Sequence, residues 1–146
     1  MKRLLLLAIA FVPLTAAADA PPAATYKSEA ELHSALAAGQ GTPTMLASPV
    51  SISDRHRINL IKRTQAAGAV AHPGFAELHH IVDGSGTLVT GGTMVPGSGR
   101  GGATIQNGES KRVSKGDVIL IPSGMPHWYK DLDGTITYLE VRWEEK

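Results

Sequence analysis

The chain has 146 residues, of which 42% are hydrophobic and 18% charged, and its formal net charge is +1 at pH 7. This length has room for one domain, and the composition argues against a disordered chain. The small net charge gives no bulk attraction for nucleic acid, and the absence of cysteine excludes disulfides and thiolate metal ligands.

Residues 1–18 have the organisation of a secretory signal peptide. Lys2 and Arg3 give a positive start, an apolar run follows over 4–14, and small residues occupy 16–18. We predict cleavage after residue 18, which leaves a net charge of 12 − 13 = −1. The alternative is an uncleaved anchor, for which the apolar run is short. The pattern therefore predicts a periplasmic or secreted protein without a stable membrane anchor.

Residues 19–43 are predicted to form a linker and one short helix. The stretch 19–26 is rich in alanine and proline. Ser28 and Glu31 have capping-box spacing, and an apolar stripe follows, so we expect a helix over 29–38 that covers part of the domain. A frayed N-terminal arm is the alternative.

Residues 44–146 are predicted to form an all-β domain. Short segments rich in Val, Ile, Thr and Tyr alternate with turn signals, which is typical of an antiparallel sandwich or barrel. The expected strands are 55–64, 69–72, 77–82, 87–90, 103–106, 110–113, 117–121, 127–130 and 135–143. The turn signals between them are Gly84-Ser85-Gly86, Gly91-Gly92, Asn107-Gly108 and Asp133-Gly134.

Two segments carry a recognisable spacing. In the second, Gly116 is followed after five residues by Pro122-Ser123-Gly124 and, two residues later, by His127. In the first, His72 precedes Glu77 by four intervening residues, and Gly84 follows Glu77 after six.

These segments resemble the two signature motifs of the cupin superfamily, and the chain is similar to its small, single-domain, type 2-like members. The resemblance implies a cupin jelly-roll β-barrel, an antiparallel double-stranded β-helix. The sequence departs from the family pattern at three positions. Val70 stands where the family has a first histidine, Thr64 where it has a glycine, and Asp131 where it has an asparagine.

The same residues point to a metal without reference to the family. Strand alternation places Glu77, His79 and Ile81 on one face, and barrel interiors are normally apolar. A buried carboxylate or imidazole needs a partner. One divalent cation bound by His72, Glu77 and His127 would satisfy all three, as in two-histidine, one-carboxylate sites. Its identity, among Fe, Mn, Ni, Cu and Zn, stays open.

His79 is predicted to be a fourth metal ligand or a pocket residue; as a ligand it would replace the histidine missing at Val70. The alternatives are a group that hydrogen-bonds to a ligand, or an acid/base near neutral pH. In a catalytic site, His79 or Glu77 would be the nearest proton acceptor. The charged residues at the C-terminus are interpreted as a solvated tail: Glu140, Arg142, Glu144, Glu145 and Lys146.

The functional hypothesis is an exported, metal-binding cupin that acts on a small organic molecule in the barrel mouth, with dioxygenase-like or isomerase chemistry. The alternative is a non-catalytic cupin that binds a small ligand with a vestigial or absent metal. A homodimer fits the way cupins commonly pair, and no nucleic-acid partner is expected.

Overall fold

The computed structural model describes residues 23–39, 41–97 and 102–145. The predicted signal peptide lies outside these ranges. Within the described residues, one helix, α1 (Glu29–Ala37), precedes nine strands. The strands are β1 (Gly41–Thr42), β2 (Met45–Ile52), β3 (His56–Arg63), β4 (Phe75–Thr90), β5 (Thr93–Val95), β6 (Thr104–Gln106), β7 (Glu109–Ser114), β8 (Val118–Ile121) and β9 (His127–Glu144).

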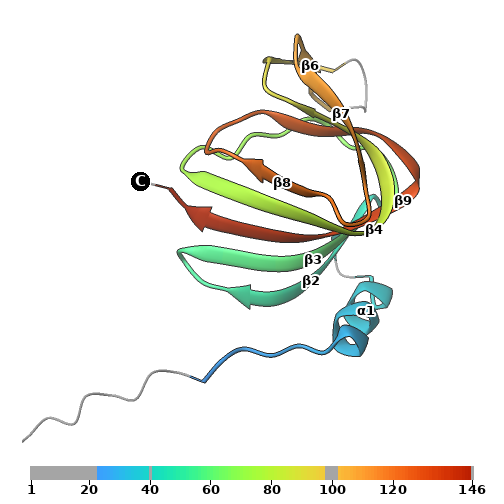
Figure 1. Ribbon diagram of the computed structural model, residues 1–146, viewed down its shortest axis with the longest axis vertical. Helices are drawn as coiled ribbons and strands as arrows, with labels where there is room; N and C mark the ends of the chain where they lie inside the picture. Colours follow the sequence, from blue (N-terminus) through green and yellow to red (C-terminus); the bar gives the residue numbers. More distant parts are fainter. Residues whose placement is uncertain (1–22, 40, 98–101, 146) are drawn as a thin grey trace, which may run out of the picture.

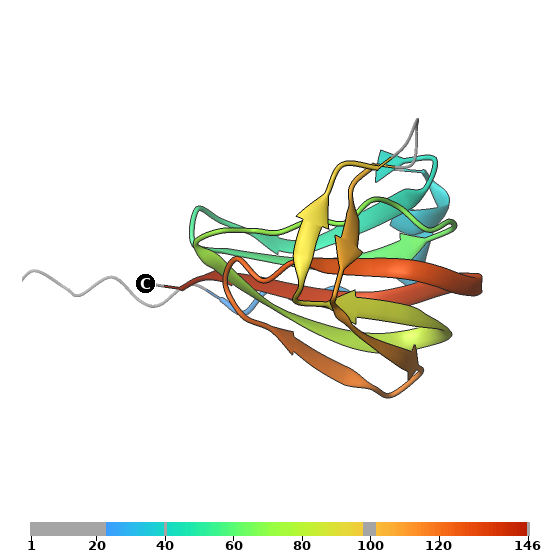
Figure 2. The ribbon, with the colours of Figure 1, turned by 90° about the horizontal axis from the view of Figure 1, so that it is seen from above.

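The strands form a jelly-roll barrel, as the sequence predicts (Figures 1 and 2). In the described part of the chain all strand pairs are antiparallel. Seven strands form one sheet in the order β1-β2-β3-β9-β4-β7, with β8 also paired to β4, and β5 and β6 form a separate two-stranded sheet. The first part of β4 pairs with β8 and with the end of β9, and its second part pairs with β7 and the start of β9. These two long strands therefore run from one side of the barrel to the other.

Gly84 marks the bend in β4. Its φ is +78°, and a Cβ there would meet the carbonyl oxygen of Thr135 on β9 at 2.0 Å. The register with β9 shifts on both sides of this glycine. Only glycine combines this backbone conformation with so close a neighbouring strand.

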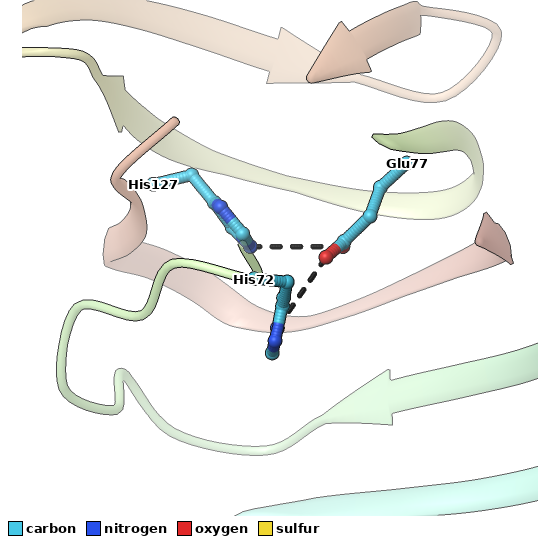
Figure 3. A group of neighbouring side chains, drawn as sticks. All are labelled: His72, Glu77 and His127. Carbon is cyan, nitrogen blue, oxygen red and sulfur yellow. Dashed lines mark ion pairs between the residues drawn. The ribbon is translucent and has the colours of Figure 1, made fainter. Parts of the chain in front are cut away.

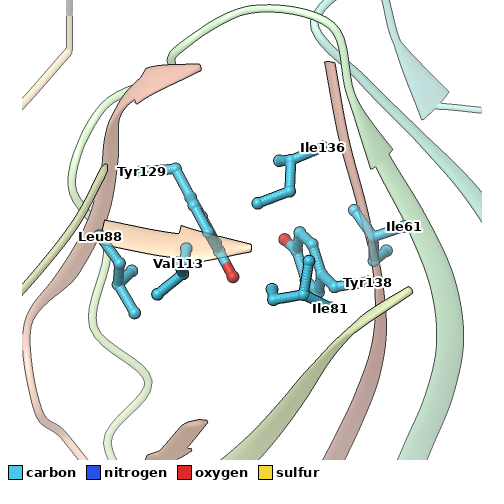
Figure 4. Packing of buried hydrophobic residues seen from close by; sticks show 7 residues of the cluster. All are labelled: Ile61, Ile81, Leu88, Val113, Tyr129, Ile136 and Tyr138. Atoms are coloured by element: carbon cyan, nitrogen blue, oxygen red, sulfur yellow. The ribbon is translucent and has the colours of Figure 1, made fainter. Parts of the chain in front are cut away.

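The apolar core lies inside the barrel and is shown in Figure 4. Its buried members come from β3, β4, β7 and β9: Ile61, Ile81, Leu88, Val113, Tyr129, Ile136 and Tyr138. Burial of this apolar area is the main force that closes the barrel.

The capping box of α1 is confirmed. Ser28 Oγ accepts from the backbone N–H of Glu31 at 3.3 Å, and Glu31 Oε2 accepts from the Ser28 N–H at 2.7 Å. The helix ends at residue 37 and buries Leu36 beside Leu46 and Lys62 of the neighbouring strands. It thus covers part of the barrel, as expected. No helix among the described residues is long and apolar enough to cross a membrane.

Several strand boundaries differ from the prediction. The segments predicted at 77–82 and 87–90 are one strand, as are those at 127–130 and 135–143, so Gly84-Ser85-Gly86 and Asp133-Gly134 bend strands and do not end them. β2 was not predicted; it contains Pro49, which the structure accommodates at a register shift. The segment at 69–72 forms only a bridge between Val70 and His127.

Candidate metal site

Two loops bring His72 and His127 together at one end of the barrel. Val70 and His127 exchange backbone hydrogen bonds of 3.0 and 2.9 Å. The Gly124 N–H donates to the His72 carbonyl at 3.2 Å, and its φ of +72° suits the tight reversal after Pro122. The Pro-x-Gly turn of the second motif therefore holds the histidine of the first motif in place.

Glu77 projects from β4 between the two histidines, as Figure 3 shows. His72 Nε2 lies 3.3 Å from Glu77 Oε1, and His127 Nε2 lies 3.7 Å from Glu77 Oε2. The donor atoms of the three residues all lie within 4.8 Å of one another. The expected convergence of these side chains is thus present, while their role as metal ligands stays a prediction.

Hydrogen bonds fix which ring nitrogens face the centre of this group. His127 Nδ1 lies 3.1 Å from the carbonyl oxygen of Met125, so Nδ1 carries the proton and Nε2 presents a lone pair. His72 Nε2 accepts from Arg142 Nη2 at 3.0 Å, so it presents a lone pair as well. A ligating histidine commonly has its outer nitrogen held by a carbonyl in this way.

The electrostatics of the group also fit a cation. Burial lowers the pKa of His127 and of His72, which favours neutral imidazoles. Burial alone would raise the pKa of Glu77, but the hydrogen bond from His79 and the positive charge of Arg142 are among the effects that outweigh it and lower that pKa. Two imidazole lone pairs and a carboxylate thus face one another. Glu77 Oε1 has no hydrogen-bond donor among the described residues, so the donor set fits a divalent metal.

His79 is engaged at both ring nitrogens. Its Nε2 lies 3.1 Å from Glu77 Oε2, and because a carboxylate only accepts, Nε2 donates. Its Nδ1 therefore accepts from the Tyr129 hydroxyl at 3.0 Å. His79 is 1% exposed and lies beside Glu77 and Glu140, whose carboxylates with it form a second group of potential ligands. Tyr129 donates to His79 and His79 donates to Glu77, so these two hydrogen bonds orient the Glu77 carboxylate.

The interpretation of Glu140 and Arg142 as part of a solvated tail is wrong. Glu140 is 8% exposed, and its two oxygens accept from Arg142 Nη2 at 2.8 Å and from Asn59 Nδ2 at 3.0 Å. Arg142 Nε lies 3.2 Å from Glu77 Oε1 without hydrogen-bond geometry. Strand alternation from Ile136 and Tyr138 was the available signal, because it places these two residues on the inner face.

A cavity of 740 Å³ opens onto the group. All four predicted ligands line it, together with Val70 and an apolar wall that includes Met45, Ala47, Ile52 and Ile61. His72 is the most exposed of the four, with a side chain 30% exposed, whereas Glu77 is 2% exposed. The group thus lies at the base of an accessible chamber.

A family model described as Cupin matches residues 52–134, which is more than half of the chain. This span contains His72, Glu77, His79 and His127 but neither Glu140 nor Arg142. No curated protein matches the sequence.

Solved structures of low sequence identity share the fold. A protein from Ralstonia eutropha JMP134, described as a candidate mannose-6-phosphate isomerase, is 17% identical, with a TM-score of 0.53 over 72% of this chain and 89% of that one. One from Thermotoga maritima, described as a predicted oxalate decarboxylase, is 17% identical, with a TM-score of 0.53 over 69% and 81%. The iron(II) form of HppE is 9% identical, with a TM-score of 0.56 over 68% and 51%.

Proposed function

Because the chain belongs to the cupin family, we propose that it is an exported, metal-binding cupin that acts on a small organic molecule at a mononuclear divalent-metal site in the barrel mouth. The observation that carries this proposal is the convergence of His72, Glu77 and His127 at the base of the cavity. His127 Nε2 presents a lone pair to this group, whereas the His72 Nε2 lone pair accepts from Arg142 in the metal-free protein. Glu77 Oε1 has no hydrogen bond from the described residues. A buried carboxylate needs a cation beside it, a role that Arg142 has in the metal-free protein and that the metal would take over.

In this proposal His72, Glu77 and His127 hold the metal, and His79 is the residue that positions Glu77. A bound divalent metal would supply Lewis-acid or oxygen-activating chemistry. His79 Nε2–H donates to Glu77 Oε2, so this pair can hold or pass a proton beside the substrate. The Glu77 carboxylate, which only accepts, fixes this tautomer, and the buried Tyr129 hydroxyl donates to the remaining lone pair at Nδ1.

The reaction class is proposed as dioxygenase-like or isomerase-like. Structural neighbours are described as an isomerase and a decarboxylase, and another is an iron(II) protein. These descriptions apply to those proteins and do not assign a reaction to this chain, since one fold supports many reactions. They define which assays to run first: oxygen uptake and isomerisation of small organic acids and sugars.

One observation favours the alternative, a cupin that binds a small ligand without metal. Arg142 Nη2 occupies the His72 Nε2 lone pair, and the guanidinium lies against Glu77 and Glu140. An arginine can thus neutralise the two carboxylates where a metal would otherwise do so. Val70, in place of a family ligand, points in the same direction.

Metal analysis of the purified mature protein separates the two functions. We expect one equivalent of a divalent metal, its loss in His127→Ala, and its retention in His80→Ala. His80 is the matched control because it is on the outward face of β4. Stoichiometric metal in folded His127→Ala would exclude this residue as a ligand. A wild-type protein that cannot be loaded with Fe, Mn, Ni, Cu or Zn would favour the alternative.

Export remains part of the proposal and rests on the pattern of residues 1–18. The expected mature protein begins at residue 19, which mass spectrometry of the exported material would detect. Full-length protein in the cytoplasmic fraction alone would contradict export. The homodimer stays a prediction.

A further inference from the structure

Among the described residues, three arginines and two acidic residues line the cavity. Arg57 and Arg63 come from β3 and Arg142 from β9, while Glu77 and Glu140 are the acidic lining residues. A chamber with this charge balance favours an anionic ligand, and a divalent metal would increase the excess of positive charge.

The three arginines differ in what already engages them. Arg63 Nε donates to the Tyr138 hydroxyl at 3.0 Å, and its guanidinium lies 5.4 Å from the centre of the Tyr129 ring, so it is fixed in the interior. Arg142 is held by Glu140, His72 and Glu77. Arg57 is exposed, and its side chain makes no hydrogen bond or ion pair with the described residues.

Arg57 and Arg142 are directly opposed on adjacent antiparallel strands. Both line the cavity, so their side chains lie on the same face. Two like charges in this position destabilise a sheet unless an anion lies between them. This pair lies on the wall of the chamber that also contains His72.

Metal binding would leave Arg142 with fewer partners and so favour binding of an anion beside it. The metal requires Glu77 and the His72 Nε2 lone pair, and Arg142 contacts both of these in the metal-free protein. Arg142 would then keep Glu140 and be left with unpaired N–H groups beside Arg57. Arginine donates two parallel N–H groups that match the two oxygens of a carboxylate.

We propose that the cavity takes a small organic acid, with Arg142 and Arg57 binding its carboxylate. This inference rests on the proposed function, because the metal is what releases Arg142. The apolar wall formed by Met45, Ala47 and Ile61 receives the rest of the molecule. The volume of 740 Å³ falls in the range of small-molecule sites.

Calorimetry tests this proposal independently of catalysis. The probes are benzoate, succinate and citrate, their neutral amides, and inorganic phosphate, each added to metal-free and metal-loaded protein at up to about 10 mM. We expect at least one carboxylate to bind the loaded protein about tenfold more tightly than its amide. We expect Arg57→Gln to weaken that binding about tenfold and leave the affinity for metal alone unchanged.

Lys62→Gln is the matched control, because it removes the same charge from the same strand on the opposite face. Equal binding of acids and amides, equal effects of the two substitutions, or the absence of carboxylate binding at every concentration would overturn the proposal. If phosphate binds more tightly than any of the carboxylates, and Arg57→Gln weakens that binding, the ligand would be a phosphate and not an organic acid. Failure of the metal titration alone would instead refute the proposed function, whatever the carboxylates do.

Discussion

Arg142 Nη2 donates a hydrogen bond of 3.0 Å to His72 Nε2, so an arginine occupies the lone pair that a metal would require. The same guanidinium lies 3.2 Å from Glu77 Oε1 and donates to Glu140 at 2.8 Å. Arg142 and a metal therefore compete for two of the three proposed ligands.

This competition predicts opposite effects of Arg142→Met on metal affinity and on stability. The variant keeps an apolar stem but leaves Glu77 and Glu140 without their cation, so the metal-free protein should lose about 3 kcal/mol of unfolding free energy. Its affinity for a divalent metal should rise about tenfold. Urea unfolding in chelator and calorimetry with the metal alone measure the two effects.

Arg57→Met controls for the loss of positive charge near the site. The Arg57 side chain makes no hydrogen bond or ion pair with the proposed ligands, so Arg57→Met should leave the affinity for metal alone unchanged. Equal effects of the two substitutions, or an unchanged affinity in Arg142→Met, would show that Arg142 does not compete with the metal.

His79 is expected to act through Glu77 and not as a ligand, since both of its ring nitrogens are engaged. His79→Leu should lower metal affinity 10- to 100-fold, as removal of an orienting partner commonly does. Tyr129→Phe should act in the same direction more weakly, because it leaves the imidazole in place. Stoichiometry should remain one metal per chain in both variants. Loss of all metal binding in His79→Leu, with full binding in Tyr129→Phe, would identify His79 as a ligand.

The family motifs predicted the barrel and the residues that meet in the cavity because both signatures are short and local. Pro122 and Gly124 shape a turn whose geometry follows from the backbone alone, and His127 follows that turn directly. Alternation along β4 then placed Glu77 and His79 on the inner face, which the structure confirms by their burial.

Arg142 and Glu140 were missed because charged residues near a chain terminus are usually solvated. Their burial depends on the pairing of β9 with β3 and β4, which brings Asn59, Glu77 and His72 to them from distant parts of the chain. Alternation along β9 indicates the inward face of these two residues, but no local spacing identifies the partners that long-range pairing brings to them. The continuity of β4 through Gly84 was missed for a related reason, because a glycine bend and a hairpin turn share the same residues.

Alanine substitutions at two glycines on neighbouring strands distinguish the cost of backbone strain from the cost of a steric clash. Gly84 and Gly134 have φ values of +78° and +79°, but only at Gly84 would a Cβ meet a backbone atom, the Thr135 oxygen at 2.0 Å. Gly134→Ala should therefore cost about 1 kcal/mol from its conformation alone. Gly84→Ala should cost about 3 kcal/mol or more, because β9 must also move. Urea unfolding compares the two, and equal losses would contradict the close approach of β9.

The buried tyrosines predict a loss of stability at alkaline pH. Burial raises the pKa of Tyr138 from 10.0 to about 12, and it also raises the pKa of Tyr129. Above pH 10 the unfolded chain releases these protons while the folded chain keeps them, so the stabilisation present below pH 10 is lost as pH rises toward 12. Each tyrosine should contribute a slope of about 1.4 kcal/mol per pH unit near pH 11.

Tyr138→Phe tests this assignment, because it removes one of the two titrating groups. It should lower stability at pH 7 by about 1 kcal/mol, since Arg63 Nε loses its acceptor. Between pH 10 and 12 its unfolding free energy should fall about half as steeply as that of the wild type, because Tyr129 alone still resists ionisation. Tyr26→Phe, at a side chain that is 80% exposed, controls for the loss of any tyrosine. A slope in Tyr138→Phe equal to that of the wild type would mean that Tyr138 ionises as readily in the barrel as in the unfolded chain.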